Sequence, residues 1–88
     1  GGINVFSAGD HIGQPGTEEM TLADPGYPFY KKLVVRAGTD GATRLVGAVL
    51  FGETGDAPWY LRLIAEATPI DRLRRTMIFA RELAEQAA

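Results

Sequence analysis

Two apolar, β-rich segments joined by a flexible linker constrain the fold of this 88-residue sequence more than any other feature. Residues 29–36 and 44–51 are rich in aromatic and β-branched side chains, and the linker 37–43 contains two glycines and an aspartate. Such a linker between two β-rich runs is typical of an antiparallel hairpin. The second run is apolar at both alternating sets of positions, which predicts a central strand with both faces covered. Within it, Gly47 predicts a close approach of another segment to the backbone.

Two more strands are expected before this hairpin. Residues 3–8 carry apolar side chains on both alternating faces, which predicts a short strand that is buried on both sides. Residues 18–23 also alternate, so we expect one of their faces to pack and the other to contact water. The intervening loop, 11–17, contains two glycines and a proline and is expected to be irregular and exposed.

The apolar period changes to that of a helix in the last third of the chain. Four apolar residues at i, i+3, i+4 and i+7 spacing predict a helix over 57–67, with Thr54 and Asp56 as candidate N-caps. Thr68, Pro69 and Asp71 resemble a capping box, which predicts that a second helix begins there. We therefore expect the α+β class, with a small, mainly antiparallel sheet of about four strands followed by two C-terminal helices.

Length and charge limit the organisation of the chain and its partners. A chain of this length has room for one domain, which we expect to cover residues 1–88. The absence of an initiator Met leads us to expect a fragment of a larger protein. The net charge of −2 comes from 9 basic and 11 acidic residues that are interspersed, which argues against nucleic-acid binding. No apolar run reaches the roughly 18 to 20 residues that span a bilayer, so we expect no membrane partner and a cytoplasmic location.

The residue types that carry chemistry are sparse. Cysteine is absent, which excludes a disulfide, a thiolate metal site and a thiol nucleophile. His11 lies beside Asp10, but one histidine gives too few ligands for a zinc site, so we expect a solvated loop residue. Glu53, Asp56 and Glu66 form no pair with a reason to be catalytic. We therefore expect no catalytic and no metal-binding residue.

The segment Val5–Asp10 resembles the flavin-binding signature in which a Gly-Asp pair at the end of a strand contacts the ribityl chain. That signature works together with a glycine-rich βαβ unit, and no G-x-G-x-x-G occurs in this sequence. We therefore expect the isolated chain to bind no cofactor.

Two groups of side chains are candidates for a contact with another protein surface. Arg72, Arg74 and Arg75 either grip a phosphate or an acidic partner surface, or lie on a solvated helix face. Four aromatic residues beside loops and a helix start either serve an interdomain or subunit contact, or pack in the core. Only their exposure can decide between these alternatives. The candidate interface residues are Phe29, Tyr30, Trp59, Tyr60, Arg72 and Arg75.

Four blocks in fixed order carry a resemblance to a known family: residues 2–10, 30–34, 45–52 and 58–60 (GINVFSAGD, YKKLV, LVGAVLFG and PWY). They resemble the C-terminal domain of NAD(P)H nitrite reductase large subunits. The same order and spacing recur in nitrate reductase electron-transfer proteins and in rubredoxin reductases. One departure is residues 53–57, where this resemblance would lead us to expect Asp-Thr-Ala-Asp-Gly, and it bears on local turn geometry.

The resemblance implies a role in an oxidoreductase. In that family, N-terminal domains hold FAD and NAD(P)H, and a small C-terminal sheet flanked by helices packs against them. It implies that this chain is an accessory, non-catalytic domain that shapes the interface to a second subunit or electron carrier, with a homodimer as one option. FAD, NAD(P)H, an iron–sulfur cluster and sirohaem are implied for the parent flavoprotein, and none of them for this chain.

The leading hypothesis is therefore an accessory domain of an FAD-dependent NAD(P)H nitrite (or nitrate) reductase of nitrate assimilation. Two alternatives remain open. One is the equivalent domain of a rubredoxin or ferredoxin reductase, and the other is a free-standing protein-interaction module.

Overall fold

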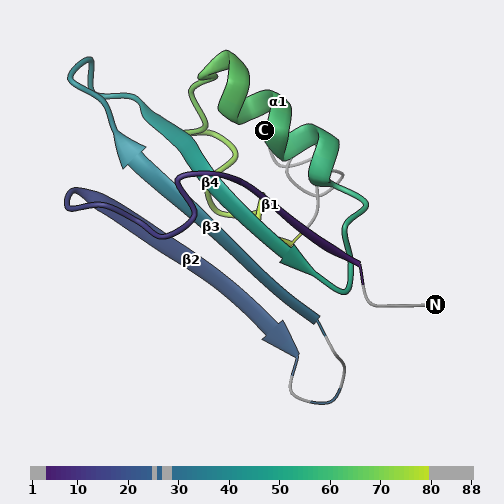
Figure 1. Cartoon of the computed structure of the whole chain (residues 1–88). Coiled ribbons are helices and arrows are strands. Elements are labelled where there is room, and N and C mark those ends of the chain that lie inside the picture. Colours follow the sequence, from purple (N-terminus) through teal and green to yellow (C-terminus); the bar gives the residue numbers. More distant parts are fainter. Residues whose placement is uncertain (1–3, 25, 27–28, 80–88) are drawn as a thin grey trace.

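The fold is built on a four-stranded sheet with a helix on one face. The computed structural model describes residues 4–24, 26 and 29–79. The elements in chain order are β1 (Val5–Gly9), β2 (Thr17–Asp24), β3 (Phe29–Ala37), β4 (Thr43–Phe51) and α1 (Ala57–Glu66). All neighbouring strands are antiparallel, in the spatial order β1-β4-β3-β2 (Figure 1). The predicted α+β class and its antiparallel sheet are confirmed.

The hairpin of β3 and β4 is the centre of the sheet, as predicted. Its loop is closed by Arg44, whose two terminal nitrogens lie 3.0 and 2.8 Å from the carboxylate oxygens of Asp40. The backbone N–H of Ala42 donates to the same carboxylate at 3.1 Å. These contacts stabilise the ionised form and lower the pKa of Asp40 to about 2. The loop conformation is therefore held by charged side chains as well as by the turn itself.

β1 differs from its prediction. It is an edge strand that pairs only with β4, and its side chains are covered on one face rather than on both. Phe6 packs against the core, whereas Val5 is 65% exposed on the other face. Ile3, the first residue of the predicted strand, lies outside the described residues. The predicted alternation of β2 is confirmed, because Met20 and Leu22 pack against the core.

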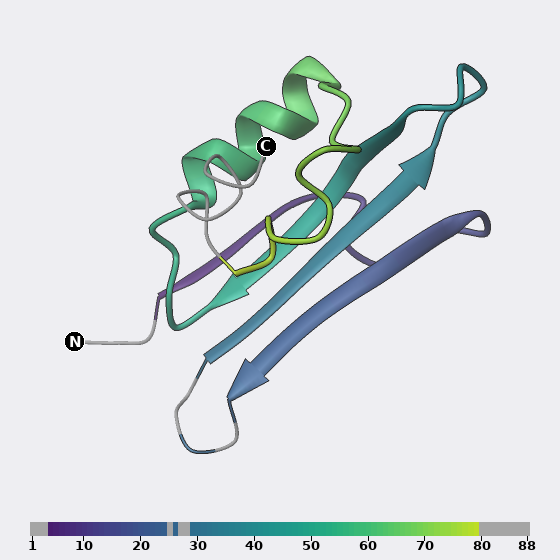
Figure 2. The same ribbon diagram turned by 180° about the vertical axis from the view of Figure 1, so that it is seen from behind.

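The hydrophobic core fills one face of the sheet, which we call the core face. It receives Leu33 and Leu50 from the two central strands, and both side chains are fully buried. α1 covers this face with Tyr60 and Leu63, and the segment after the helix adds Ile70 and Met77. Figure 2 shows α1 and this segment on the same side of the sheet. The predicted helix over 57–67 is confirmed to within one residue.

The predicted second helix is wrong for the residues that the structure describes. Residues 71–79 form successive turns, and residues 80–88 lie outside the description. The segment is bonded to the sheet instead: the N–H of Ile70 donates to the carbonyl of Thr43 at 2.8 Å. Both carboxylate oxygens of Asp71 lie 3.2 Å from the N–H of Thr43. Because Asp71 bonds to the start of β4, it is not placed to close a capping box, and the segment extends along β4 instead.

The connection 10–16 runs across the opposite face, which we call the outer face. It must travel from one edge strand of the sheet to the other, and it passes over the two central strands (Figure 1). A Cβ atom at Gly47 would collide with the backbone of Asp10, so this position tolerates only glycine without a shift. The close approach predicted at Gly47 is confirmed, and the approaching segment is the start of this connection.

Candidate functional site

The outer face carries an apolar row that the connection 10–16 leaves open. Val5 is paired with Phe51, Phe51 with Tyr30, and Tyr30 with Ala23, so the row crosses all four strands. Side chains at directly paired positions lie about 4.5 to 5.5 Å apart at Cβ and therefore contact one another. Val5 and Tyr30 are 65% and 37% exposed, Ala23 is exposed, and Phe51 is half-buried. We call these four residues the outer row.

The rest of the outer face is polar or covered, apart from Val49, which is half-buried in the neighbouring row. The neighbouring row contains Lys32, whose Nζ lies 3.2 Å from a carboxylate oxygen of Glu19. Further along, Val34 is paired with Gly47, beside which the connection 10–16 crosses, and its side chain is fully buried. Among the described residues, the outer row is therefore the most exposed apolar group that the strands present on this face.

The six residues predicted for an interface do not come together. Trp59 and Tyr60 are 7% and 0% exposed and pack in the core beneath α1, with ring centroids 5.2 Å apart, so the core interpretation holds for them. Phe29 is half-buried at the start of β3, and Tyr30 belongs to the outer row. Arg72 and Arg75 are exposed on the segment that packs on the core face of the sheet. The predicted interface residues that are exposed therefore lie on two separate surfaces: Tyr30 on the outer face, and Arg72 and Arg75 on the opposite side of the sheet.

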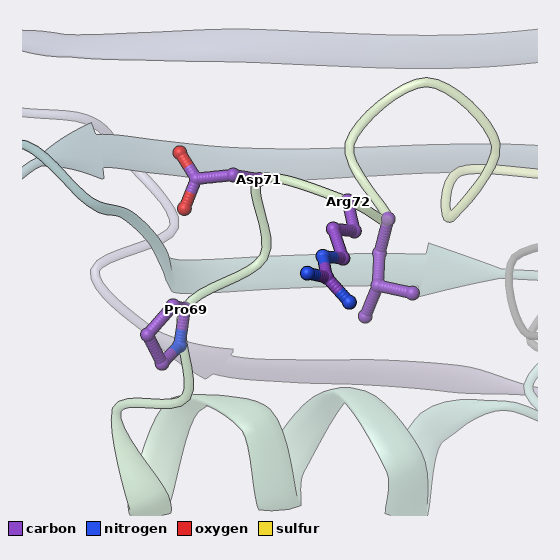
Figure 3. A pocket seen from close by; sticks show the side chains of 4 residues that line it. Pro69, Asp71 and Arg72 are labelled. Atoms are coloured by element: carbon purple, nitrogen blue, oxygen red, sulfur yellow. The ribbon is translucent and has the colours of Figure 1, made fainter. Parts of the chain in front are cut away.

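The exposed Arg72 lies at a shallow hollow of about 330 Å³, which is lined by Pro69, Asp71, Arg72 and Leu73 (Figure 3). Its acidic group is already engaged, because the Asp71 carboxylate accepts from the backbone of β4. The neighbouring Arg74 forms an ion pair with Glu18 of β2. These polar side chains hold the segment 69–79 against the sheet, which is a structural role.

A buried lysine is the polar feature that the sequence analysis missed. Lys31 is 2% exposed, and its Nζ donates to the hydroxyl of Tyr60 at 3.0 Å and lies 3.5 Å from the carbonyl oxygen of Phe79. The Tyr60 hydroxyl in turn donates to the carbonyl of Met77. Together these bonds tie β3, α1 and the C-terminal segment to one another. The signal was in the alternation, since Lys31 shares its parity with the core residue Leu33.

Burial determines the protonation behaviour of this pair. Desolvation lowers the pKa of Lys31, and the negative charges of Asp56 and Glu53 act in the opposite direction. Burial also raises the pKa of the Tyr60 hydroxyl well above its ordinary value, with a smaller contribution from Asp56. The tyrosine therefore remains a neutral donor. The arrangement fastens the C-terminal segment.

The residues that resemble a flavin-binding signature act within their own loop. The carboxylate of Asp10 accepts from the N–H of Gly13 at 3.3 Å. His11 is exposed, as predicted, and its Nδ1 lies 3.3 Å from the carbonyl of Gly9. Among residues 4–24, 26 and 29–79, no three His, Cys, Asp or Glu side chains gather as metal ligands do. In the same part of the chain, no helix has the length and apolarity needed to cross a bilayer.

Comparison with known families decides where the fold belongs. The family described as the rubredoxin NAD+ reductase C-terminal domain matches residues 1–68, a span that includes all four strands and α1. The chain belongs to this family. No curated protein and no solved structure matches it. The match supports the resemblance to reductase C-terminal domains. It does not specify nitrite as the electron acceptor. It stops immediately before the segment 69–79, where the predicted second helix is absent.

Proposed function

We propose that this chain is the accessory C-terminal domain of an FAD-dependent NAD(P)H reductase whose electron acceptor is nitrite or nitrate. In this proposal, other domains of the same parent chain hold FAD and NAD(P)H. The present chain packs against them and shapes the surface that meets a second subunit or the next electron carrier. The family match over residues 1–68 is the observation that carries the accessory-domain part of the proposal.

The geometry of the described polar groups supports an accessory role. Asp71 and Arg74 bond to the sheet, and Lys31 and Tyr60 join three elements in the interior. General acid–base catalysis needs a group within hydrogen-bond reach of a substrate, and these four groups are directed at protein atoms instead. Nitrite as the acceptor is supported by the four sequence blocks and their order, which resemble nitrite reductase large subunits.

The test uses the full-length protein that contains this chain. We expect the purified protein to carry FAD, measured by its absorbance, and to oxidise NADH or NADPH when nitrite is supplied. The isolated 88-residue chain, titrated with FAD, serves as the control and is expected to bind none. Stoichiometric flavin binding by the isolated chain would contradict the accessory role. If the flavin-loaded full-length protein does not oxidise the nicotinamide cofactor with nitrite, nitrite is ruled out as the electron acceptor.

The description of the family favours a second candidate, a rubredoxin reductase. The same assay separates the two, with rubredoxin replacing nitrite as the acceptor. Oxidation of the nicotinamide cofactor with rubredoxin and not with nitrite would assign the parent protein to this second class. The sequences that flank the chain provide an independent check, because an iron–sulfur module and a sirohaem portion are expected only for the nitrite reductase.

A further inference from the structure

β2 is an edge strand whose free side no described element covers. It pairs with β3 alone, and Figures 1 and 2 both show it at the margin of the sheet. An edge strand presents a row of backbone N–H and C=O groups that are directed away from the sheet and can pair with another strand. The chemistry of this side of β2 therefore fits an added strand, provided that no side chain blocks it.

The usual devices that protect an edge are missing from β2. Native proteins protect edge strands by keeping them short, or with lysine, proline or a bulge. β2 has eight residues, contains neither lysine nor proline, and pairs with β3 in an unbroken register. The other edge strand, β1, has only five residues and ends at Gly9, whose φ is +65°. Of the two edges, β2 is the one that is open to pairing.

The charges of β2 lie towards its two ends and are already engaged. Glu18 forms an ion pair with an arginine of the C-terminal segment, and Glu19 forms one with a lysine of β3. At the other end, the carboxylate of Asp24 accepts from the backbone N–H of the following turn at 2.9 Å. Residues 20–23 between them carry no charge. The middle of β2 can therefore accept a second strand without the burial of an uncompensated charge.

We propose that β2 pairs with β2 of a second copy of this chain, so that the two sheets form one continuous antiparallel sheet. Such self-pairing is generated by a two-fold axis perpendicular to the sheet. The axis passes between two identical residues and places the core faces of both copies on the same side. The inference deepens the proposed function, on which it rests, by naming a second copy as the subunit that is met and β2 as the contact.

The charges of β2 favour one register for this pair. When Met20 lies on the axis, Glu18 is opposite Leu22 of the other copy, and Glu19 is opposite its Thr21. No like charges are then directly opposed, and nearly the whole length of β2 is paired. The strand is thus complementary to itself, which supports a second copy as the occupant.

The other registers are less favourable. An axis at Thr21 places Glu18 opposite Asp24, and an axis at Glu18 or Glu19 places a carboxylate opposite its own copy. Like charges at directly opposed positions of a sheet are destabilising. An axis at Leu22 avoids these contacts, but it leaves the start of β2 without a partner. The register with Met20 on the axis therefore combines the longest pairing with no charge conflict.

The pairing also joins the two hydrophobic cores. Met20 and Leu22 are half-buried and pack at the margin of the core beneath β2. The two-fold axis brings the same side chains of the other copy beside them on the same face. Each copy thereby covers apolar surface that the other leaves accessible, and this burial is favourable.

Two variants at Thr21 test the pairing in the full-length protein that contains this chain. Thr21 is exposed, and in the proposed register it lies opposite Glu19 of the other copy. Thr21→Glu therefore opposes like charges at two symmetric positions, whereas Thr21→Lys opposes unlike charges there. We expect the first variant to raise the dissociation constant of the dimer by roughly 2- to 30-fold and the second to lower it by a similar factor, measured by sedimentation velocity.

Controls separate this effect from changes within one copy. Ser7, an exposed residue of the other edge strand, is replaced by Glu and by Lys, and neither change is expected to alter the dissociation constant. Thr21 is paired with Lys32 inside its own sheet, so the denaturation midpoints of the Thr21 variants are measured separately. In addition, a photoreactive phenylalanine analogue at position 21 is expected to give a product with the mass of two chains, joined within residues 17–23, and at position 7 none.

Each outcome decides a definite point. A monomeric full-length protein, equal dissociation constants for the two Thr21 variants and the parent, or cross-links from position 21 that stay within one chain would overturn the inference. Weaker association of both variants would overturn the register and move the axis to Thr21. The expected responses in a protein that does not reduce nitrite would support the β2 contact and rule out nitrite as the acceptor. Nitrite reduction by a monomer would do the reverse.

Discussion

The two faces of the sheet use neighbouring residues of the same strands for different purposes. On the core face, Leu33 and Leu50 are fully buried beneath α1 and the segment that follows it. On the outer face, the residues of the outer row remain accessible. The contrast is sharpest between adjacent residues: Lys31 points into the core and bonds to Tyr60, whereas Lys32 lies on the outer face and pairs with Glu19. The core face provides the stability of the fold, and the outer face presents an exposed apolar row.

The largest difference between the faces is expected for truncation of buried and exposed apolar side chains. Leu50→Ala removes a fully buried side chain from the core face and is expected to lower the free energy of unfolding by about 2 to 5 kcal/mol. Val5→Ala on the exposed row is expected to change it by no more than about 0.5 kcal/mol. Urea denaturation of the two variants measures both values. Equal losses would show that the outer row is part of the core of this domain.

A smaller effect is expected where the connection crosses the outer face. Gly47→Ala places a methyl group against the backbone of Asp10 and is expected to cost about 1 to 3 kcal/mol, as overpacking does. Gly41→Ala is the matched control: its methyl group meets no atom, and the cost arises from the backbone angle φ of +84°. Denaturation midpoints and amide exchange in residues 10–16 are the measurements. The comparison would fail if Gly47→Ala left the exchange of this segment unchanged.

The smallest effect is a dependence of stability on pH that distinguishes Lys31 from Lys32. Burial lowers the folded-state pKa of Lys31, so between that pKa and the higher pKa of the unfolded chain the unfolded state binds more protons. The free energy of unfolding should therefore rise with pH in this window, and the penalty should be fully present below it. Lys31→Met should remove this rise, and Lys32→Met should retain it. Denaturation midpoints at several alkaline pH values provide the measurement.

Other groups that titrate near Lys31 also contribute to the pH dependence, so they must contribute equally in the two lysine variants. Tyr60, Asp56 and Glu53 act on Lys31 or titrate beside it. The raised pKa of Tyr60 acts in the opposite direction, because above the pKa of an unfolded tyrosine the folded state holds the additional proton and stability falls. Because Lys31 donates to the Tyr60 hydroxyl, this contribution differs between the two lysine variants, so the comparison is made in a Tyr60→Phe background in which it is absent. A rise that persists in Lys31→Met would assign the pH dependence to another group.

Alternation along the strands predicted most of the sheet, because it depends on each side chain and its immediate neighbours. The hairpin and the packed side of β2 followed from it, and the extent of α1 followed from the helical spacing of apolar residues. Its failure at 3–8 has a simple cause: apolar residues at both parities indicate two apolar faces, and they carry no information on whether each face is covered. The candidate site was predicted only at Tyr30. The other members of the outer row join it through the strand order, which alternation does not contain.

The segment after α1 shows where local patterns stop being sufficient. Thr68, Pro69 and Asp71 have the residue types of a helix start, yet Asp71 bonds to Thr43 of β4. β1 pairs with β4 only as far as Gly47, and Pro69 forms a bridge with Arg44 on the remaining stretch of the strand. Pairing of this strand with the segment outweighed a weak preference for helix, as tertiary context commonly does.

The sequence by itself determined the class of the fold, the central hairpin, the crowding at Gly47 and membership of a reductase domain family. Each of these follows from composition, periodicity or ordered motifs, which are properties of residues close together in the chain. The tertiary structure decided which face α1 covers, that Lys31 is buried, that the last described segment lacks a helix and that the outer row stays open. These depend on strand order and on contacts between residues far apart in sequence, where the geometry of the whole sheet determines which groups can meet.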